Sequence, residues 1–284
     1  MADNKPSSCS GNCGSCGSSC SERNQDPFRL ENNPYNSIKK VIGVVSGKGG
    51  VGKSVVTALS AVASSRIGLS TAILDADITG PSIPKIFGVK GKAFGDPDGN
   101  IIPVETETGI KLMSVNLILE NETDPVAWRG PVISGVVKQF WTDVAWGNVD
   151  CMLVDMPPGT GDVMLTAFQS LPLDGIIIVT SPQELVNMVV EKAVGLAGQM
   201  NVPILGVVEN LSYILCPKCG ERIEIFGKSR TGEICERHGL KIAAEIPIFP
   251  EIAERSDNGT LESIDISCID DLAALIRNVQ DSES

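Results

Sequence analysis

A glycine-rich stretch in the first quarter of the chain has the residue types and spacing that bind phosphate groups. It reads Gly47-Lys48-Gly49-Gly50-Val51-Gly52-Lys53-Ser54 and matches G-x-x-x-x-G-K-[ST]. In this pattern glycines let backbone N–H groups cradle phosphate oxygens, aided by the positive end of the following helix. Lys53 would contact the β- and γ-phosphates, and the Ser54 hydroxyl would coordinate Mg²⁺. The stretch therefore predicts a nucleotide site, with an ordinary glycine-rich turn as the alternative.

Carboxylates follow two apolar segments and could complete that site. Asp75 and Asp77 end the segment TAILDAD, and Asp155 ends the segment CMLVD. Catalytic groups of doubly wound sheets collect at such strand ends, and Asp155 has the position of a Walker B carboxylate that holds Mg²⁺ through water. The following Pro-Pro-Gly-Thr-Gly-Asp, residues 157–162, is predicted to form a loop that senses the γ-phosphate. The alternative is that these aspartates only cap helices.

Two cysteines far along the chain are spaced to bind one metal centre. Cys216 and Cys219 form a C-P-x-C turn, which supplies two thiolates, only half of a tetrahedral site. Cys235 and His238 follow at the spacing of a zinc ribbon, which would close the site within one chain. These two residues, however, lie in a segment predicted to be a surface helix. A C-x₂-C turn without metal is the third reading.

The N-terminal segment contains four more cysteines. They are spaced C-x₃-C-x₂-C-x₃-C, at Cys9, Cys13, Cys16 and Cys20. Thiols separated only by small polar residues resemble a cluster-binding tail more than core packing. Zinc binding, transient cluster capture and an inert tail are the alternatives. Cys151 and Cys268 are expected to be small core residues.

Composition limits the classes of protein to which the chain can belong. It has 284 residues, 42% of them hydrophobic and 20% charged, which suits one large folded domain or two small ones. The net charge of −12 argues against nonspecific nucleic-acid binding, and no apolar run approaches the roughly 18 residues of a membrane span. No basic-then-apolar signal peptide is recognised, and the nine cysteines then favour a reducing compartment. We expect a cytoplasmic protein that binds neither nucleic acid nor membrane.

The elements that must position these residues follow from the apolar pattern. Apolar runs at residues 41–46, 71–77, 149–159, 175–181 and 202–208 are predicted to contain buried strands, and residues 54–68, 184–200 and 270–279 are predicted to be helices. Continuous apolar strands that alternate with helices predict an α/β fold, a doubly wound and mostly parallel sheet covered on both faces. Residues 88–110 are expected to form an excursion or hairpin. We divide the chain into a flexible tail, 1–37, and a P-loop ATPase domain, 38–284.

The second lysine of the glycine-rich stretch extends the assignment to a family. Lys48 makes the stretch similar to the deviant Walker A pattern, K-G-G-x-G-K-[ST], of the ParA/MinD group of P-loop ATPases. The resemblance implies ATP as the nucleotide and a homodimer in which Lys48 reaches the nucleotide of the partner. It also implies that Asp77 orients the attacking water and that Asp75 assists Mg²⁺ or the water network. A solvated lysine is the alternative for Lys48.

Further motifs narrow the resemblance to the Mrp/ApbC branch, the iron–sulfur cluster scaffolds and carriers. They are DADITGPSIP at residues 75–84, DMPPGTGD at 155–162, and VENLS at 208–212 followed by CPKC at 216–219. The resemblance covers about residues 38–275. It implies that Asn210 contacts the adenine and that Pro247, in the I-P-x-x-P segment, lies near the base. It also implies slow ATP turnover and a [4Fe–4S] cluster, bridged by Cys216 and Cys219 of two chains and passed to apo-proteins.

Three other functions use the same nucleotide site. A positioning or partitioning ATPase would need a basic amphipathic C-terminal helix, whereas the chain ends in LAALIRNVQDSES, with one basic residue and two acidic ones. A zinc-ribbon ATPase would have no iron chemistry. An electron-donating reductase, by resemblance to the nitrogenase iron protein, would not need a C-P-x-C pair.

Overall fold

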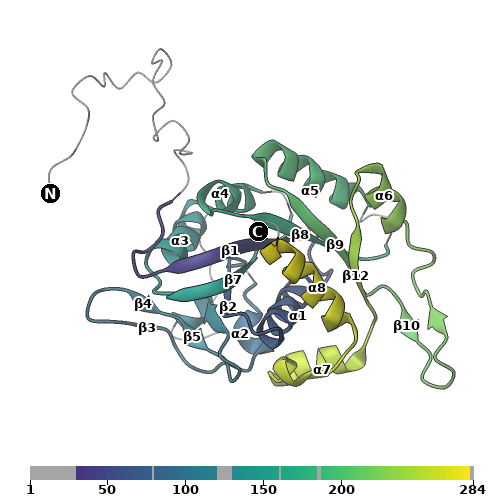
Figure 1. Ribbon diagram of the computed structural model, residues 1–284, viewed down its shortest axis with the longest axis horizontal. Coiled ribbons are helices and arrows are strands. Elements are labelled where there is room, and N and C mark those ends of the chain that lie inside the picture. The colour runs from purple at the N-terminus through teal and green to yellow at the C-terminus, as the bar shows by residue number, and fades with distance from the viewer. Residues whose placement is uncertain (1–29, 79, 120–129, 160, 184–186, 282–284) are drawn as a thin grey trace, which may run out of the picture.

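The computed structural model describes residues 30–78, 80–119, 130–159, 161–183 and 187–281. Its centre is an eight-stranded sheet in the order β12-β9-β8-β1-β7-β2-β6-β5 (Figure 1). β5 pairs antiparallel with β6, and the other seven strands run parallel. The strands are β1 (Ser37–Val45), β2 (Thr71–Asp75), β5 (Val104–Glu105), β6 (Lys111–Met113), β7 (Asn148–Asp155), β8 (Gly175–Thr180), β9 (Ile204–Asn210) and β12 (Ile242–Ile246).

Helices cover both faces of the sheet. One layer contains α1 (Lys53–Arg66), α2 (Ile83–Ile86), α7 (Pro250–Asn258) and α8 (Cys268–Asp281). The other contains α3 (Gly130–Thr142), α4 (Asp162–Ser170), α5 (Asn187–Met200) and α6 (Thr231–Arg237). Because successive strand residues point to opposite faces, β7 sends Leu153 into the first core and Val154 into the second. Strands buried on both faces read as unbroken apolar runs, and this explains why the sequence predicts them well.

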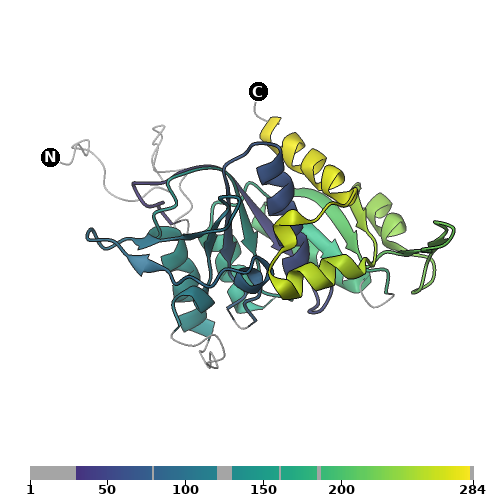
Figure 2. The same cartoon turned by 90° about the horizontal axis from the view of Figure 1, so that it is seen from below.

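Two small hairpins lie outside the main sheet. β3 (Phe94–Gly95) pairs with β4 (Ile101–Ile102), and β10 (Ile214–Leu215) pairs with β11 (Arg222–Ile223). Figures 1 and 2 both show the β10–β11 hairpin projecting from the body of the molecule beyond β12. We call residues 213–228 the cysteine hairpin, because they include Cys216 and Cys219.

The predicted fold is confirmed: the sheet is mostly parallel and covered on both faces. β3 and β4 form a hairpin inside the predicted excursion, while the short strands β5 and β6 and the helix α3 were not predicted. Residues 1–29 of the predicted tail lie outside the described residues. Its last part contacts the domain, since Leu30 N donates to Ser170 O at 3.2 Å and Asn33 is buried. No described helix is long and apolar enough to cross a membrane.

Candidate functional site

The glycine-rich loop joins the end of β1 to the start of α1, as the sequence predicts. Gly52 caps α1 with φ 80° and Gly50 has φ 84°, a left-handed backbone that side chains other than glycine rarely adopt. A Cβ on Gly49 or Gly50 would meet no atom within 4 Å. The loop therefore faces an open space with its backbone, next to the N-terminus of a 14-residue helix. Such a surface attracts anions.

Lys53 lies at the centre of a buried network that closes the loop. Its Nζ is 2.8 Å from Asp155 Oδ1 and 3.6 Å from Asp77 Oδ2, and its side chain is 6% exposed. Ser54 Oγ donates to Asp155 Oδ2 at 2.6 Å, and Thr57 Oγ1 donates to Asp155 Oδ1 at 2.7 Å. β7, the loop and α1 are thus locked together around one carboxylate. The hydroxyl and carboxylate oxygens form the hard donor set that Mg²⁺ prefers.

Asp75 is the most strongly perturbed carboxyl of the network. Burial, together with the neighbouring Asp155 carboxylate and against the opposing effect of Lys53, raises its pKa to about 8. Asp75 Oδ2 accepts a hydrogen bond from Ser114 Oγ at 3.0 Å, and Oδ1 accepts one from the backbone N–H of Asp77 at 3.1 Å. At neutral pH, in the absence of ligand, Asp75 is therefore mostly protonated. Its fixed position holds Asp77 at the rim of the site.

A cleft of about 380 Å³ opens over the loop. Its lining combines the loop with the strand ends and with α2 and α7. The polar lining residues are Ser46, Lys53, Ser54, Asp77, Ser82, Lys85, Ser256 and Asp257. The volume falls within the range of small-molecule sites.

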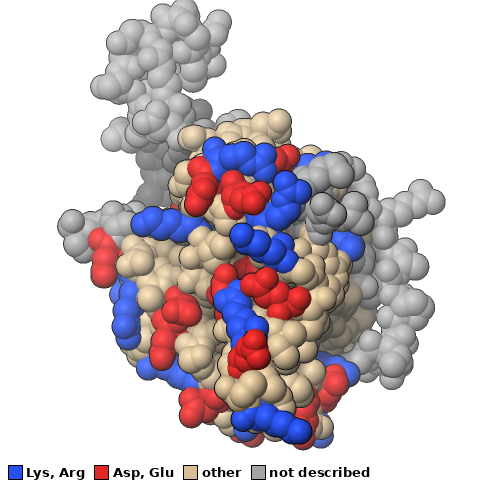
Figure 3. Space-filling view, turned by 90° about the vertical axis from the view of Figure 1, so that its right-hand side faces the viewer, with Lys and Arg blue, Asp and Glu red and all other residues tan. Residues whose placement is uncertain are grey.

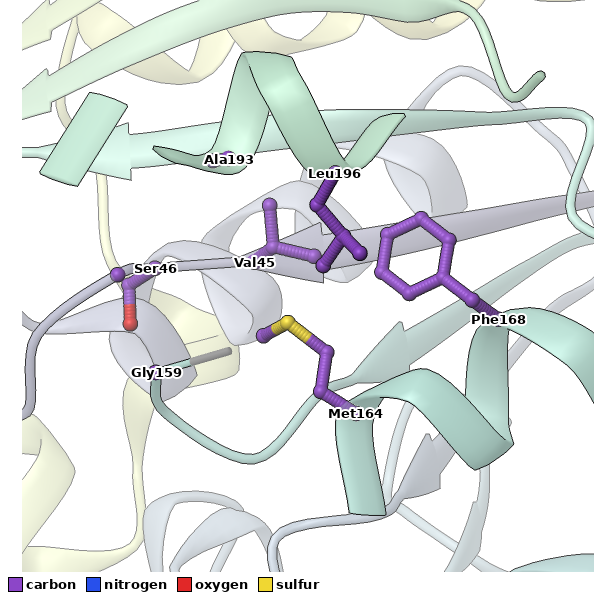
Figure 4. A pocket seen from close by; sticks show the side chains of 8 residues that line it. Val45, Ser46, Gly159, Met164, Phe168, Ala193 and Leu196 are labelled. Carbon is purple, nitrogen blue, oxygen red and sulfur yellow. The ribbon is translucent and has the colours of Figure 1, made fainter. Parts of the chain in front are cut away.

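The segment after β7 is fastened to the start of the glycine-rich loop. Gly159 N donates to Ser46 O at 2.9 Å. Behind this contact, Met164 and Phe168 of α4 converge with Leu196 of α5 around Val45 (Figure 4). This apolar packing couples the loop to α4. Thr160 and the side chain of Asp162, part of the predicted γ-phosphate-sensing loop, lie outside what the structure describes.

The remaining predicted nucleotide residues surround the same loop. Lys48 is exposed and makes no ion pair or hydrogen bond within the described part of the chain. Asn210, at the end of β9, donates from Nδ2 to Val51 O at 2.9 Å, and a Cβ on Gly52 would lie 2.2 Å from that nitrogen. Pro247 directly follows β12, whose Ile246 is paired with Asn210. Asn210 and Pro247 therefore lie at neighbouring strand ends.

Cys216 and Cys219 form a tight turn on the cysteine hairpin. Cys216 N donates to Glu221 O at 2.9 Å, and Gly220 N donates to Cys216 O at 2.9 Å with Gly220 at φ 72°. Hydrogen bonds from the backbone N–H groups of Lys218 and Cys219 lower the pKa of the Cys216 thiol. The turn thus favours the thiolate, the form that binds metal. Cys219 is exposed and Cys216 half-buried.

The structure does not assemble the zinc-ribbon alternative. Among the described residues, no three or more Cys, His, Asp or Glu side chains are grouped so that they could hold a metal ion. Cys235 is buried on α6, where burial raises the pKa of its thiol. Cys235 and His238 therefore do not join Cys216 and Cys219. Cys151 and Cys268 are buried core residues, as predicted, and Cys9, Cys13, Cys16 and Cys20 lie outside the described residues.

Three residues of this region were not predicted as site residues. Thr57 lies one helical turn after Lys53, a spacing that could have indicated its contact with Asp155. Ser114 follows β6, a three-residue strand too short to be recognised. Glu209 is fully buried at the end of β9, where it accepts hydrogen bonds from Ser212 and Ser229. An acidic residue that ends an apolar strand was the available signal for Glu209.

Comparison with known proteins assigns the chain to a family. The ParA-group family described as "NUBPL iron-transfer P-loop NTPase" matches residues 37–280. The chain belongs to this family. As a P-loop NTPase it is a nucleotide-binding ATPase, in agreement with the loop and with the Mrp/ApbC resemblance of the sequence.

Curated members and solved structures resemble this P-loop NTPase over most of its length. An iron-sulfur cluster carrier protein of Clostridium perfringens is 44% identical, covering 89% of this chain and 94% of the relative. One of Methanocaldococcus jannaschii is 41% identical over 88% and 89%. A nucleotide-binding protein of Archaeoglobus fulgidus, solved with ADP, has a TM-score of 0.73 and 43% identity over 81% of this chain and 90% of that one. Pyrococcus furiosus MinD, with a TM-score of 0.62 and 19% identity over 84% and 99%, shares the fold.

Proposed function

We propose that the protein is an ATP-dependent iron–sulfur cluster carrier. It binds a [4Fe–4S] cluster between Cys216 and Cys219 of two chains and passes the cluster to apo-proteins. The observation that carries this proposal is the exposed two-cysteine turn, tuned toward the thiolate, in a chain with a complete P-loop. The names of the 41–44% identical relatives support the same cargo.

The nucleotide site has the donors that ATP and Mg²⁺ require. Residues 47–54 would hold the phosphates, with Lys53 as the buried cation, and Asn210 and Pro247 would contact the base. Ser54 and Asp155 would hold Mg²⁺, which when bound neutralises phosphate charge. Asp77, at the rim of the cleft and 3.6 Å from Lys53, would orient the attacking water, with Asp75 supporting it.

A homodimer would complete both sites. Lys48 is exposed beside the cleft, so it is available to reach the nucleotide of a partner chain. Apolar side chains surround the cysteine turn although they are 41–50% exposed: Leu215, Ile223, Ile225 and Phe226. On this side of the molecule Lys and Arg are interspersed with Asp and Glu (Figure 3). A mixed surface permits an identical copy to approach without strong like-charge repulsion.

The four N-terminal cysteines would form a second sulfur site. Cys9, Cys13, Cys16 and Cys20 offer four thiols within twelve residues of sequence, enough for one cluster from a single chain. The described cysteines are all free thiols, which fits a reducing, cytoplasmic location. The proposed partners are apo iron–sulfur proteins, with no role for nucleic acid or membrane.

Anaerobic reconstitution tests the proposal. A Cys9/Cys13/Cys16/Cys20→Ala variant isolates the cysteine hairpin, and Cys216→Ala and Cys219→Ala are added to a second sample. Iron, acid-labile sulfide and zinc are quantified per chain, with visible absorption to identify the cluster. We expect iron and sulfide in equal amounts in the first sample and neither in the second.

One control and two contradicting outcomes define the meaning of the result. Cys235→Ala should leave the iron content unchanged, because this thiol is buried away from the hairpin. Iron and sulfide retained after loss of Cys216 and Cys219 would contradict the proposed cluster site. Zinc without sulfide in all samples would contradict the carrier function.

A further inference from the structure

Glu209 joins the two ends of the cysteine hairpin. Its carboxylate is fully buried at the end of β9. Oε1 accepts a hydrogen bond from Ser212 Oγ at 2.6 Å, and Oε2 accepts one from Ser229 Oγ. Ser212 immediately precedes the hairpin and Ser229 immediately follows it. One side chain therefore holds both the entry and the exit of the segment that carries Cys216 and Cys219.

The residue next to Glu209 touches the nucleotide loop. Asn210 donates to Val51 O and lies against Gly52, as described above. Leu211 follows with φ 57°, an uncommon backbone for a leucine, and sharply turns the chain between Asn210 and the hairpin. The glycine-rich loop and both ends of the hairpin thus meet within four consecutive residues, 209–212.

Further contacts of the hairpin also join it to the region around Glu209 and Asn210. Arg222 pairs with Glu245 of β12 at 2.6 Å and stacks over the Tyr213 ring at 4.1 Å. Glu245 and Ile246 are the register partners of Glu209 and Asn210. Ser212 N also donates to Ile246 O at 2.9 Å. The hairpin is therefore attached to the ends of β9 and β12, where the proposed base-contacting residues also lie.

A buried carboxylate holds the surface hairpin, although burial of its charge is unfavourable. Burial of a charge is unfavourable unless hydrogen bonds compensate it, and a well-packed apolar side chain would serve stability at least as well. Unlike an apolar side chain, Glu209 fixes the orientation of the chain on both sides of the hairpin, because hydrogen bonds keep the two serine hydroxyls aligned with its two oxygens. A displacement of β9 at residue 209 would therefore move both ends of the hairpin together.

We infer that Glu209 is a positioning residue that couples the nucleotide loop to the cysteine hairpin. The inference rests on the proposed function, in which this coupling would be the route by which ATP alters cluster binding. A nucleotide that draws the Asn210 amide away from Val51 O shifts residues 209–211. Glu209 then transmits the shift through Ser212 and Ser229 to the turn that holds Cys216 and Cys219.

Thiol labelling of the full-length, metal-free protein tests this coupling. The alkylation rates of Cys216 and Cys219 are measured under anaerobic, reducing conditions by peptide mass spectrometry, with and without a non-hydrolysable ATP analogue and Mg²⁺. We expect the analogue to change the wild-type rate about five-fold or more, the lower range of allosteric coupling. In Ser229→Ala and Glu209→Gln, the ratio of the alkylation rate with the analogue to the rate without it should approach one. The affinity for the analogue should change less than about three-fold.

A matched control exists on the other side of the molecule. Glu262 also accepts hydrogen bonds from two hydroxyls, those of Thr106 and Thr108. Glu262→Gln should keep the wild-type ratio. Ser229→Ala, which leaves the buried charge and Ser212 in place, maintains the test if Glu209→Gln does not fold.

Two results would overturn the inference. The first is an alkylation rate of the wild type that does not change when the analogue is added. The second is a Ser229→Ala variant whose rate changes with the analogue as much as that of the wild type. Neither depends on iron. Failure of cluster reconstitution would instead remove the proposed function and leave the coupling measurement intact.

Discussion

The glycine-rich loop and the cysteine hairpin differ in how completely one chain builds them. Around the loop, Lys53 and Asp155 are 6% and 0% exposed and lie 2.8 Å apart, with Ser54 and Thr57 bonded to the same carboxylate. On the hairpin, Cys219 is exposed, and the flanking apolar residues remain accessible to solvent. The loop is supported by β1, β7, β9 and α1, whereas the hairpin is a two-stranded extension of the main body.

Under the proposed function, this difference indicates how much a partner chain would have to supply at each site. The nucleotide site has its cation, its carboxylates and its backbone cradle within one chain. The cysteine turn has two sulfur ligands, and a [4Fe–4S] cluster takes four. Changes in the loop should therefore affect folding and nucleotide binding within each chain, and changes in the hairpin should affect metal binding and association with little loss of stability.

Removal of the buried lysine should produce the largest effect. Lys53→Ala leaves the Asp155 charge unpaired, so we expect the free energy of unfolding to fall by about 3 kcal/mol. Nucleotide affinity should fall about 100-fold. Denaturant unfolding and calorimetric titration measure the two effects.

Lys85→Ala is the control for that change. Lys85 lines the same cleft, but it pairs with Asp257 at 3.8 Å with both side chains 71–79% exposed. An exposed pair contributes at most about 1 kcal/mol. Equal losses of stability in the two variants would show that the loop is not the buried, self-contained unit described above.

Lys48 separates binding from turnover. Because it is exposed and unpaired within the described chain, Lys48→Ala should leave stability and nucleotide affinity nearly unchanged. If Lys48 acts on the nucleotide of a partner, ATP turnover should fall about 100-fold, the effect of removing one stabilising donor. Steady-state phosphate release measures the rate. Full turnover in Lys48→Ala would contradict a shared nucleotide site.

The Asp75 carboxyl gives the loop region a pH dependence between pH 5 and 7. With a pKa raised to about 8 from 3.8, the folded protein holds one more proton than the unfolded chain between those values. Stability conferred by the protonated form is therefore lost as pH rises, by up to about 1.4 kcal/mol per pH unit between pH 5 and 7. Nucleotide-free wild type and Asp75→Asn are compared by urea unfolding at pH 5, 6 and 7.

The contribution of Asp75 is obtained by subtracting the pH slope of the unfolding free energy of Asp75→Asn from that of the wild type. The lowered pKa values of Asp96 and Asp150 act below this window, because their stabilisation is lost only as pH falls through the acid range. Identical slopes in the two proteins would mean that Asp75 is ionised in the folded, ligand-free state.

The smallest effect on stability is expected on the hairpin. Arg222 pairs with Glu245 at 2.6 Å, but the two side chains are 41% and 35% exposed. Arg222→Ala should therefore cost less than about 1 kcal/mol of unfolding free energy. Reconstituted iron should dissociate to a chelator faster, because the variant also loses the contact with Tyr213 that orients the hairpin. A stability loss as large as that of Lys53→Ala would remove the distinction between the regions.

Sequence predicted the parts of this molecule that depend on neighbouring residues. The phosphate-binding loop needs eight consecutive positions, and the cysteine turn needs four, so both can be recognised locally. Buried parallel strands such as β7 also appear as apolar runs. Contacts between distant segments could not be predicted: Asn210 lies 159 residues from Val51, and Thr57 lies 98 residues from Asp155. β5 and β6 were missed because each is only two or three residues long.

The spacing of Cys235 and His238 shows that a sequence motif can also indicate a site that the fold does not form. These residues match a zinc ribbon in sequence, yet α6 buries the Cys235 side chain in the core beside Ile234. Packing of a helix overrode a spacing rule. Glu209 shows the converse: it lies in the VENLS motif, but the motif gave it no role, and its contact with Ser229, twenty residues away, is visible only in the structure.

Native mass spectrometry tests most directly whether two chains complete one cluster. The Cys9/Cys13/Cys16/Cys20→Ala variant is reconstituted anaerobically and measured with Mg²⁺ and ATP, and its mass gives the number of chains and iron ions together. We expect a species of two chains that carries one [4Fe–4S] cluster, since that cluster takes four cysteine ligands. A single chain that carries a complete cluster, or a protein that stays monomeric with both ligands supplied, would contradict it.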